Sequence, residues 1–228
     1  MPQQAVMDIN PPQQQCLDNL VVGPNAELLN DLLKQRNGFR GFWIWGRPGS
    51  GKSHLVRGYC LALHDQGEDF SYVDAATSNS GLGALQRASE YGSTVVVENV
   101  SLLAQEPLAL ELLMSLYQRL YVQHGTLIVT DQLSASAIEF PLADVNSRLR
   151  SLSHYQMLDL DDDDKAQVLK ERALHRGYEL SDQVLQYWLT HGPRQLDTLL
   201  IDLERLDRAA LSRRQLVTIP LLKSELGY

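Results

Sequence analysis

The stretch GRPGSGKS, residues Gly46–Ser53, fits the phosphate-loop pattern G-x-x-x-x-G-K-[ST] at every fixed position. Its glycines let the backbone wrap closely, so that successive N–H groups point at phosphate oxygens. The apolar run Phe39–Trp45 before the loop predicts a buried strand, and Ser53–Asp65 after it has helical spacing. The helix adds its positive N-terminal end to the loop. A strand, this loop and a helix in that order predict a P-loop nucleotide-binding domain.

Two side chains of the loop carry its chemistry. Lys52 is expected to reach the β- and γ-phosphates, and the Ser53 hydroxyl is expected to coordinate Mg²⁺. The predicted cofactors are therefore ADP or ATP, with Mg²⁺. The nucleotide-binding residues predicted in and beside the loop are Gly46, Pro48, Gly49, Ser50, Gly51, Lys52, Ser53 and His54.

An acidic residue on a neighbouring strand should help to hold the metal ion, directly or through water. Glu98 follows the β-branched run Thr94–Val97 and is the best candidate, with an ordinary strand-end carboxylate as the alternative. Asn99 stands where many ATPases of this type have a second acid, which polarises the attacking water. An amide cannot act as a general base at neutral pH, so we expect a weak ATPase at most.

A second polar strand end is Thr130-Asp131, after the predicted strand Leu127–Val129. A polar group there could lie near the γ-phosphate and act as the first sensor of the nucleotide. A turn-forming role is the alternative, because aspartate favours turns.

Strands and helices alternate through residues 17–158. Further strands are predicted at Phe70–Val73 and Tyr155–Leu158, and further helices at Leu82–Tyr91 and Leu108–Val122. This alternation implies βαβ units, and the continuous apolar strands suit a sheet covered on both faces. The predicted fold class is α/β, a P-loop domain with a parallel five-stranded sheet.

Residues 159–228 are predicted to form a small all-helical domain. Its first helix follows an acidic run, with Asp161 or Asp162 as its N-cap and Gly177 at its end. The other three helices are predicted at about Ser181–His191, at about Pro193–Ala210 with Pro193 in the first turn, and after Pro220.

The composition of the chain argues against several classes of function. A net charge of −8 disfavours broad sequence-independent binding to DNA, so little direct nucleic-acid binding is expected. Cys16 and Cys60 have no zinc-ligand spacing and are expected to be reduced thiols. No apolar run approaches the roughly 20 residues that span a bilayer, and residues 1–16 do not resemble a signal peptide. We therefore expect a cytoplasmic protein without a membrane partner.

The order of a P-loop, an acid-ended strand, a polar strand end and a helical lid resembles that of the AAA+ ATPases. Four segments are similar to the DnaA branch of replication initiators, namely LDNLVVG at Leu17–Gly23, SRL at Ser147–Leu149, GPRQL at Gly192–Leu196 and LVTIP at Leu216–Pro220. The resemblance implies that Val21 and Val22 pack around the adenine. It also implies that Arg148 is an arginine finger acting in trans and that Arg194 reaches the bound nucleotide.

Both arginines also have simpler interpretations. Arg148 could be a surface or salt-bridging arginine, and Arg150 is a near neighbour that could be mistaken for it. Arg194 could be a solvated charge at the start of a lid helix.

Within the DnaA branch, residues 17–226 look most similar to the Hda family of DnaA-homologous regulators. The helix-turn-helix DNA-binding domain and the N-terminal helicase-contacting domain of an initiator are expected to be absent. Asn99 matches the asparagine that the Hda family has at the second acidic position.

Hda proteins carry a short clamp-binding motif near the N-terminus, and residues 1–16 hold a related pattern. Gln4 matches the motif, and Met7 and Ile9 are apolar where leucines are usual. The alternative is a flexible tail, because the segment is polar and rich in Gln and Pro.

The resemblance implies a regulator of chromosomal replication initiation. Such a protein holds nucleotide, docks on the sliding clamp (the β subunit of DNA polymerase III) and presents Arg148 to ATP-bound DnaA. It would activate hydrolysis by DnaA and so inactivate the initiator. Because arginine fingers work across subunit interfaces, assembly of this protein into a homo-oligomer also remains an open alternative.

Three other functions remain open at this stage. A helicase loader would bind single-stranded DNA, which a gel shift detects. A stand-alone P-loop ATPase or kinase would turn over nucleotide without any partner. An adaptor that only recruits partners would be indifferent to the change Arg148→Ala.

Overall fold

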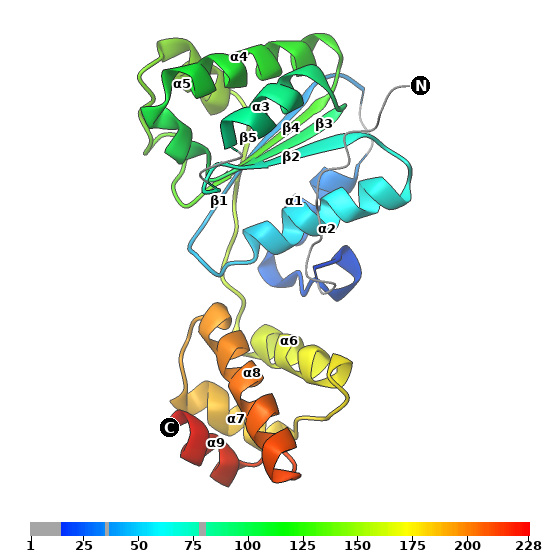
Figure 1. Ribbon diagram of the computed structural model, residues 1–228, viewed down its shortest axis with the longest axis vertical. Helices are drawn as coiled ribbons and strands as arrows, with labels where there is room; N and C mark the ends of the chain where they lie inside the picture. The colour runs from blue at the N-terminus through cyan, green and yellow to red at the C-terminus, as the bar shows by residue number, and fades with distance from the viewer. Residues whose placement is uncertain (1–14, 35–36, 78–80) are drawn as a thin grey trace. The chain divides into compact units, whose positions relative to one another are not determined.

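The computed structural model describes residues 15–34, 37–77 and 81–228, and they form two compact units (Figure 1). The first unit contains residues 15–20 and Asn25–Leu158. The second contains the short segment Val21–Pro24 together with Asp159–Tyr228. No helix in these three stretches combines the length and apolar character needed to cross a bilayer.

The first unit is built on a parallel five-stranded sheet, which confirms the predicted fold class (Figure 1). The strand order is β2-β3-β4-β1-β5. The strands are β1 (Arg40–Trp45), β2 (Phe70–Asp74), β3 (Thr94–Glu98), β4 (Thr126–Asp131) and β5 (Ser153–Gln156). Because all strands are parallel, their carboxyl ends meet at one edge of the sheet.

The fifth strand ends two residues earlier than predicted. The Met157 N–H still donates to the Trp45 carbonyl oxygen at 2.6 Å. The Leu158 N–H instead donates to Asn25 Oδ1 at 2.8 Å, so a side chain outside the sheet takes over its backbone hydrogen bond. The chain therefore leaves the sheet at this point.

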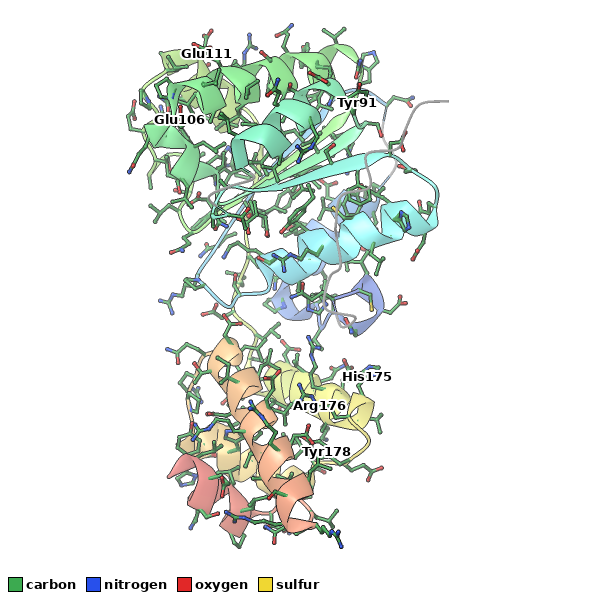
Figure 2. The ribbon with its side chains drawn as sticks, in the orientation of Figure 1. Tyr91, Glu106, Glu111, His175, Arg176 and Tyr178 are labelled. Atoms are coloured by element: carbon green, nitrogen blue, oxygen red, sulfur yellow. The ribbon has the colours of Figure 1, made fainter. Side chains whose placement is uncertain are left out.

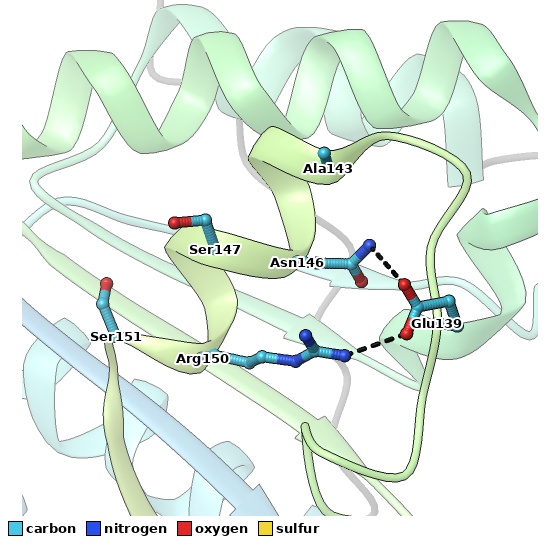
Figure 3. A pocket seen from close by; sticks show the side chains of 6 residues that line it. All are labelled: Glu139, Ala143, Asn146, Ser147, Arg150 and Ser151. Carbon is cyan, nitrogen blue, oxygen red and sulfur yellow. Dashed lines mark hydrogen bonds and ion pairs between the residues drawn. The ribbon is translucent and has the colours of Figure 1, made fainter.

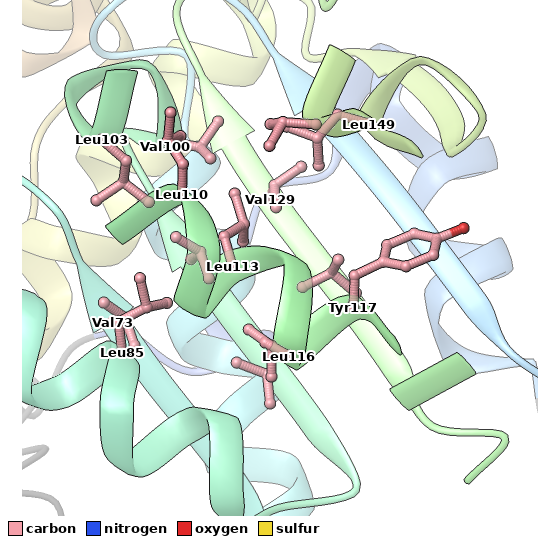
Figure 4. Packing of buried hydrophobic residues seen from close by; sticks show 14 of the residues in the cluster. Val73, Leu85, Val100, Leu103, Leu110, Leu113, Leu116, Tyr117, Val129 and Leu149 are labelled. Atoms are coloured by element: carbon pink, nitrogen blue, oxygen red, sulfur yellow. The ribbon is translucent and has the colours of Figure 1, made fainter. Parts of the chain in front are cut away.

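Helices cover both faces of the sheet (Figure 1). Alternate strand residues point to opposite faces, so Trp43 packs in one core and its neighbours Phe42 and Ile44 pack in the other. The first core also takes side chains from α3 (Gly81–Glu90), α4 (Pro107–Val122) and α5 (Ala143–Arg150), part of which Figure 4 shows. The second takes side chains from α1 (Ala26–Leu33) and α2 (Lys52–Asp65).

The helices α1 and α5 and the 3-10 helix η3 (Val100–Gln105) were not predicted from the sequence. Both α-helices have only eight residues. In α5 the buried apolar residues are Val145 and Leu149, one turn apart, which is too short a pattern to identify a helix.

The second unit is a bundle of α6 (Asp162–His175), α7 (Asp182–His191), α8 (Leu196–Arg213) and α9 (Ile219–Leu226) around the buried Trp188. Asp161 is the N-cap of α6, because its carboxylate accepts from the Asp164 N–H at 2.8 Å. Arg176 follows the last residue of α6 and pairs with Glu204 and Asp207 of α8, at 3.0 Å each (Figure 2).

The predicted start of the third lid helix at Pro193 is wrong. The helix α8 begins at Leu196, and its N-cap Gln195 has an extended backbone. Gly192 lies so close to Trp188 that an added Cβ would meet its Cδ1 atom at 2.7 Å. The chain turns tightly around this side chain through Pro193 and Arg194, and becomes helical only afterwards.

The last residue closes the helical bundle through a buried carboxylate. Tyr228 donates its hydroxyl to Asp202 Oδ2 at 2.5 Å, and Arg205 donates to Asp202 Oδ1 at 3.2 Å. Asp202 is only 3% exposed, and burial together with this hydrogen bond raises the pKa of Tyr228 to about 12. The phenol therefore stays a donor throughout the physiological range.

We expect Tyr228→Phe to destabilise the helical unit by about 1–3 kcal/mol, because it leaves one oxygen of a buried carboxylate without its donor. Amide hydrogen exchange of α8, followed by mass spectrometry, should speed up roughly 5- to 150-fold. Tyr91→Phe is the matched control, because Tyr91 is 63% exposed. Equal exchange in both variants would contradict the prediction.

Candidate nucleotide-binding site

The loop between β1 and α2 has the backbone that a phosphate loop requires. Gly49 and Gly51 have φ angles of 79° and 92°, in the left-handed region that glycine tolerates best. A Cβ on Gly46 would meet the Met157 carbonyl oxygen at 2.5 Å, so only glycine fits beside the chain that leaves β5. The Leu55 N–H donates to the Gly51 carbonyl oxygen at 2.9 Å, so α2 begins directly at the loop, and its positive N-terminal end lies there.

Lys52 lies inside this loop. Its Nζ donates to the carbonyl oxygens of Gly46 at 2.7 Å and Arg47 at 2.8 Å. The Oγ of Ser50, a buried residue, lies 3.4 Å from the same Nζ. The backbone is thus already curved around a cation, and the ammonium can exchange these oxygens for those of a phosphate. The Ser53 side chain beside it is exposed.

His54 connects the start of α2 with residues 16–19 near the N-terminus of the described chain. Its Nε2 lies 3.0 Å from the Cys16 carbonyl oxygen and 3.0 Å from Asn19 Oδ1. Gly58, one turn further along α2, lets the same segment approach, because a Cβ there would meet the Leu17 nitrogen at 3.0 Å. The contacts of His54 and Gly58 therefore anchor η1 (Leu17–Asn19) on α2.

Glu98 is a buried acid at the end of β3, with 1% of its surface exposed. The Tyr72 hydroxyl donates to its Oε2, and Arg57 Nη2 lies 3.6 Å from that same oxygen. The other oxygen, Oε1, is buried and has no hydrogen-bond partner within the described residues. A buried carboxylate oxygen without a donor suits a hard cation such as Mg²⁺. The site therefore fits Mg²⁺ through Ser53 and one oxygen of Glu98, while the second oxygen is engaged.

Asn99 has a structural role that an acid would not share. Its φ of 56° lies in the left-handed region, where asparagine is among the favoured residues, and it precedes η3. Its amide donates to Asp74 Oδ1 at 2.8 Å. The amide thus joins the ends of β2 and β3.

The strand β4 lies between β1 and β3, so its end is central in the edge that holds the loop. Asp131 accepts backbone N–H bonds from Ser101 at 2.8 Å, from Gln132 at 2.7 Å and from Leu133 at 3.3 Å. Both of its oxygens therefore serve to organise the loops that follow β3 and β4. Thr130, the other residue of this strand end, is buried with 2% of its surface exposed.

The arginines of α5 differ sharply in their surroundings. Arg150 pairs with Glu139 at 3.0 Å (Figure 3). It also donates to the carbonyl oxygens of Ala135 and Ile138. Arg148 is exposed and lies over the ring of Tyr117, 5.6 Å from its centroid. Within the described residues it makes no ion pair. Its guanidinium is therefore presented to the outside, whereas that of Arg150 fastens a loop.

Comparison with known proteins places both units. Residues 162–226 match the family described as Hda, lid domain. The helical unit is therefore similar to the lid domain of Hda over most of its length. Domain III of the replication initiation protein DnaA from Thermotoga maritima matches with a TM-score of 0.78 and 14% identity, over 94% of this chain and 96% of that one. AMPPCP-bound DnaA from Aquifex aeolicus matches with a TM-score of 0.67 and 18% identity, over 85% and 65% of the two chains.

The fold is shared beyond DnaA. The RuvB Holliday junction branch migration motor of Thermotoga maritima has a TM-score of 0.67 and 13% identity, over 93% of this chain and 71% of that one. Identities this low establish the fold, and the lid match adds the narrower relationship. The resemblance to the DnaA-related AAA+ proteins, and among them to Hda, is confirmed.

Three further predicted site residues belong to the unit that matches the Hda lid. Val21 and Val22 lie in the segment that clusters with it, and both are partly buried. Arg194 precedes α8, where its Nη1 pairs with Asp162 at 3.0 Å and donates to the Leu189 carbonyl oxygen at 3.3 Å. Its side chain is still 67% exposed, so it remains able to change partner.

Sequence reasoning missed two residues of the site, Arg57 and Tyr72. Arg57 follows Ser53 by four positions on a predicted helix, and that spacing puts both side chains on one face. Tyr72 lies on β2, beside the strand that ends in Glu98. Both positions could have been found by asking which side chains surround the predicted acid.

We expect Lys52→Ala to weaken binding of a fluorescent ADP by roughly 10- to 150-fold, because it removes a charge-assisted bond to phosphate. Lys34→Ala is the control, since its side chain is 59% exposed and its pair with Asp31 is loose at 3.8 Å. Circular dichroism should show both variants folded. Undiminished ADP affinity in Lys52→Ala would show that the loop does not bind the nucleotide.

Proposed function

We propose that this chain is a nucleotide-binding regulator of chromosomal replication initiation that, together with the sliding clamp, stimulates ATP hydrolysis by DnaA. The observation that carries the proposal is Arg148, an exposed guanidinium without an ion pair in the described residues, on a DnaA-type AAA+ unit joined to a lid that matches that of Hda. A guanidinium held in this way is available to a phosphate on another molecule.

The chain's own nucleotide is the first part of the proposal. The loop geometry supports binding of ADP or ATP, and DnaA of the same fold is known with AMPPCP bound. Val21, Val22 and Arg194 are proposed as nucleotide contacts on the ground of the resemblance to the DnaA branch. Ser53 and the unengaged oxygen of Glu98 are the groups proposed to contact Mg²⁺ when the ion accompanies the nucleotide.

The chain is proposed to retain its nucleotide rather than consume it. Asn99 offers no base for the attacking water, and its amide is engaged with Asp74. A bound nucleotide that persists would act as part of the structure. Weak turnover by the isolated protein is what this arrangement supports.

Arg148 is proposed to act on the nucleotide of DnaA. A guanidinium placed against a γ-phosphate neutralises charge in the transition state, and such fingers are worth about 10³–10⁵ in rate. An exposed cation–π contact such as that with Tyr117 is worth only about 0.5–1 kcal/mol, so leaving it costs little. Arg150 would have to abandon its pair with Glu139 and its bonds to two carbonyl groups.

We expect Arg148→Ala to abolish stimulation of DnaA hydrolysis, a loss of about 10³-fold or down to the background of DnaA itself. Binding of ADP by the variant itself should be unchanged. The measurement is phosphate release by DnaA with clamp loaded on DNA, with and without this protein. Arg150→Ala is the matched control and should retain stimulation.

The outcomes of that assay separate the proposals. No stimulation by the unchanged protein would reject the regulatory function as a whole. Full stimulation by Arg148→Ala would leave the protein as an adaptor that recruits partners. Loss of stimulation in Arg150→Ala but not in Arg148→Ala would show that Arg150, and not Arg148, is the arginine finger.

The clamp-binding residues Gln4, Met7 and Ile9 lie outside the described residues, so this part of the proposal rests on the sequence. Replacing all three by alanine should remove the stimulation that depends on clamp, because the apolar anchors and the glutamine amide are lost. Pull-down on immobilised clamp measures the binding directly. Unchanged capture and unchanged stimulation would show that residues 1–16 are only a tail.

A further inference from the structure

Arg57 stands beside the proposed metal ligands without being one of them. It follows Ser53 by one helical turn on α2, and its guanidinium lies 3.6 Å from Oε2 of Glu98. Glu98 has a side chain only 2% exposed, and that of Arg57 is 29% exposed. The carboxylate on which Mg²⁺ would depend is thus already paired with a permanent cation.

Tyr72 holds this pair in one geometry. Its hydroxyl donates to Glu98, and it accepts a hydrogen bond from Arg57 Nε at 2.9 Å. The guanidinium also lies 5.6 Å from the centroid of the Tyr72 ring. Arg57 cannot release its proton, so the pairing persists at any physiological pH.

The charges of this cluster have a direct consequence for metal binding. A bare carboxylate pair or single carboxylate attracts a divalent cation because its charge is uncompensated. Here one positive charge already compensates Glu98, and Mg²⁺ would have to approach a second cation across a poorly solvated site. Of the two carboxylate oxygens, Oε1 has no hydrogen-bond partner in the described residues and remains as a ligand.

We propose that Arg57 is a positioning residue that neutralises Glu98, so that this chain binds nucleotide with little dependence on Mg²⁺. The inference rests on the proposed nucleotide site and deepens it. In this arrangement the P-loop backbone and Lys52 hold the phosphates, and the pairing of Arg57 with Glu98 removes the carboxylate charge that would otherwise repel them in the absence of a metal ion. A regulator of this kind would keep its nucleotide when free Mg²⁺ falls.

The test is the affinity for N-methylanthraniloyl-ADP, measured by fluorescence with excess Mg²⁺ and again with EDTA. For the unchanged protein the two dissociation constants should agree within about threefold, because the charge of Glu98 is already compensated. Arg57→Met keeps the apolar stem of the side chain but removes the charge, and should raise the ratio to about tenfold or more. Arg57→Lys should restore a ratio near that of the unchanged protein.

Two further variants show that the effect passes through Glu98. Glu98→Gln in the Arg57→Met background should bring the ratio back toward one, because no buried carboxylate is left to bind the metal. Arg87→Ala, on the exposed face of α3, is the control and should leave the ratio as it was. A guanidinium that only stabilised the fold would shift the melting temperature without changing this ratio.

The outcomes distinguish this inference from the nucleotide site on which it rests. No binding of the fluorescent ADP under either condition would reject the site and the inference together. Tight binding that already collapses in EDTA, with the same collapse in Arg57→Met, would overturn the role of Arg57 alone. Should Arg57→Met fail to fold, the ratio for the unchanged protein still decides, because a strong requirement for Mg²⁺ contradicts the proposal.

Discussion

The parallel pairing of β1, β3 and β4 is the constraint on which the site depends. With β4 between the other two, the loop after Trp45, the carboxylate of Glu98 and the hydroxyl of Thr130 are delivered to one edge of the sheet. Each strand is buried on both faces, so its register is set by packing against α2 on one side and α4 on the other. The chemistry at the edge therefore inherits its geometry from the core.

Most charges at that edge are compensated inside the protein. Lys52 is bound by carbonyl oxygens of its own loop, Glu98 by Arg57 and Tyr72, and Asp131 by backbone N–H groups. Compensated charges pre-organise a pocket at little cost when a ligand arrives, and they lower the tendency to recruit a reactive water or metal. Arg148 lies outside this pattern, since its contact is with an aromatic face. This contrast is consistent with a site proposed to retain its own nucleotide and an arginine proposed to act on the nucleotide of another molecule.

Elements with a strong local signal were predictable from the sequence. The loop Gly46–Ser53 and the all-β-branched run Thr94–Val97 were predicted correctly from local sequence alone, and the acidic run predicted the N-cap at Asp161. The short helix α5 could not be found, because its two buried residues make no recognisable period. The predicted helix start at Pro193 was wrong because Gly192 approaches Trp188 closely, a tertiary contact that the local sequence does not reveal. Arg57 and Tyr72 were missed because their importance lies in contacts between elements, which spacing along one element does not reveal.

The arrangement around Glu98 and Asn99 has an energetic logic of its own. Rapid hydrolysis of a nucleotide needs a strongly bound metal ion and a base. The metal ion stabilises the charge of the transition state, and the base activates the attacking water. Here an amide stands at the position proposed for the base, and a guanidinium compensates the acid that we propose as a metal ligand. Each change alone would lower turnover, and together they leave the phosphate cradle intact while removing the means of cleavage. A nucleotide site with an intact P-loop and these two neighbours suits the proposed retention of nucleotide, and the proposed action on another nucleotide then depends on side chains outside that site.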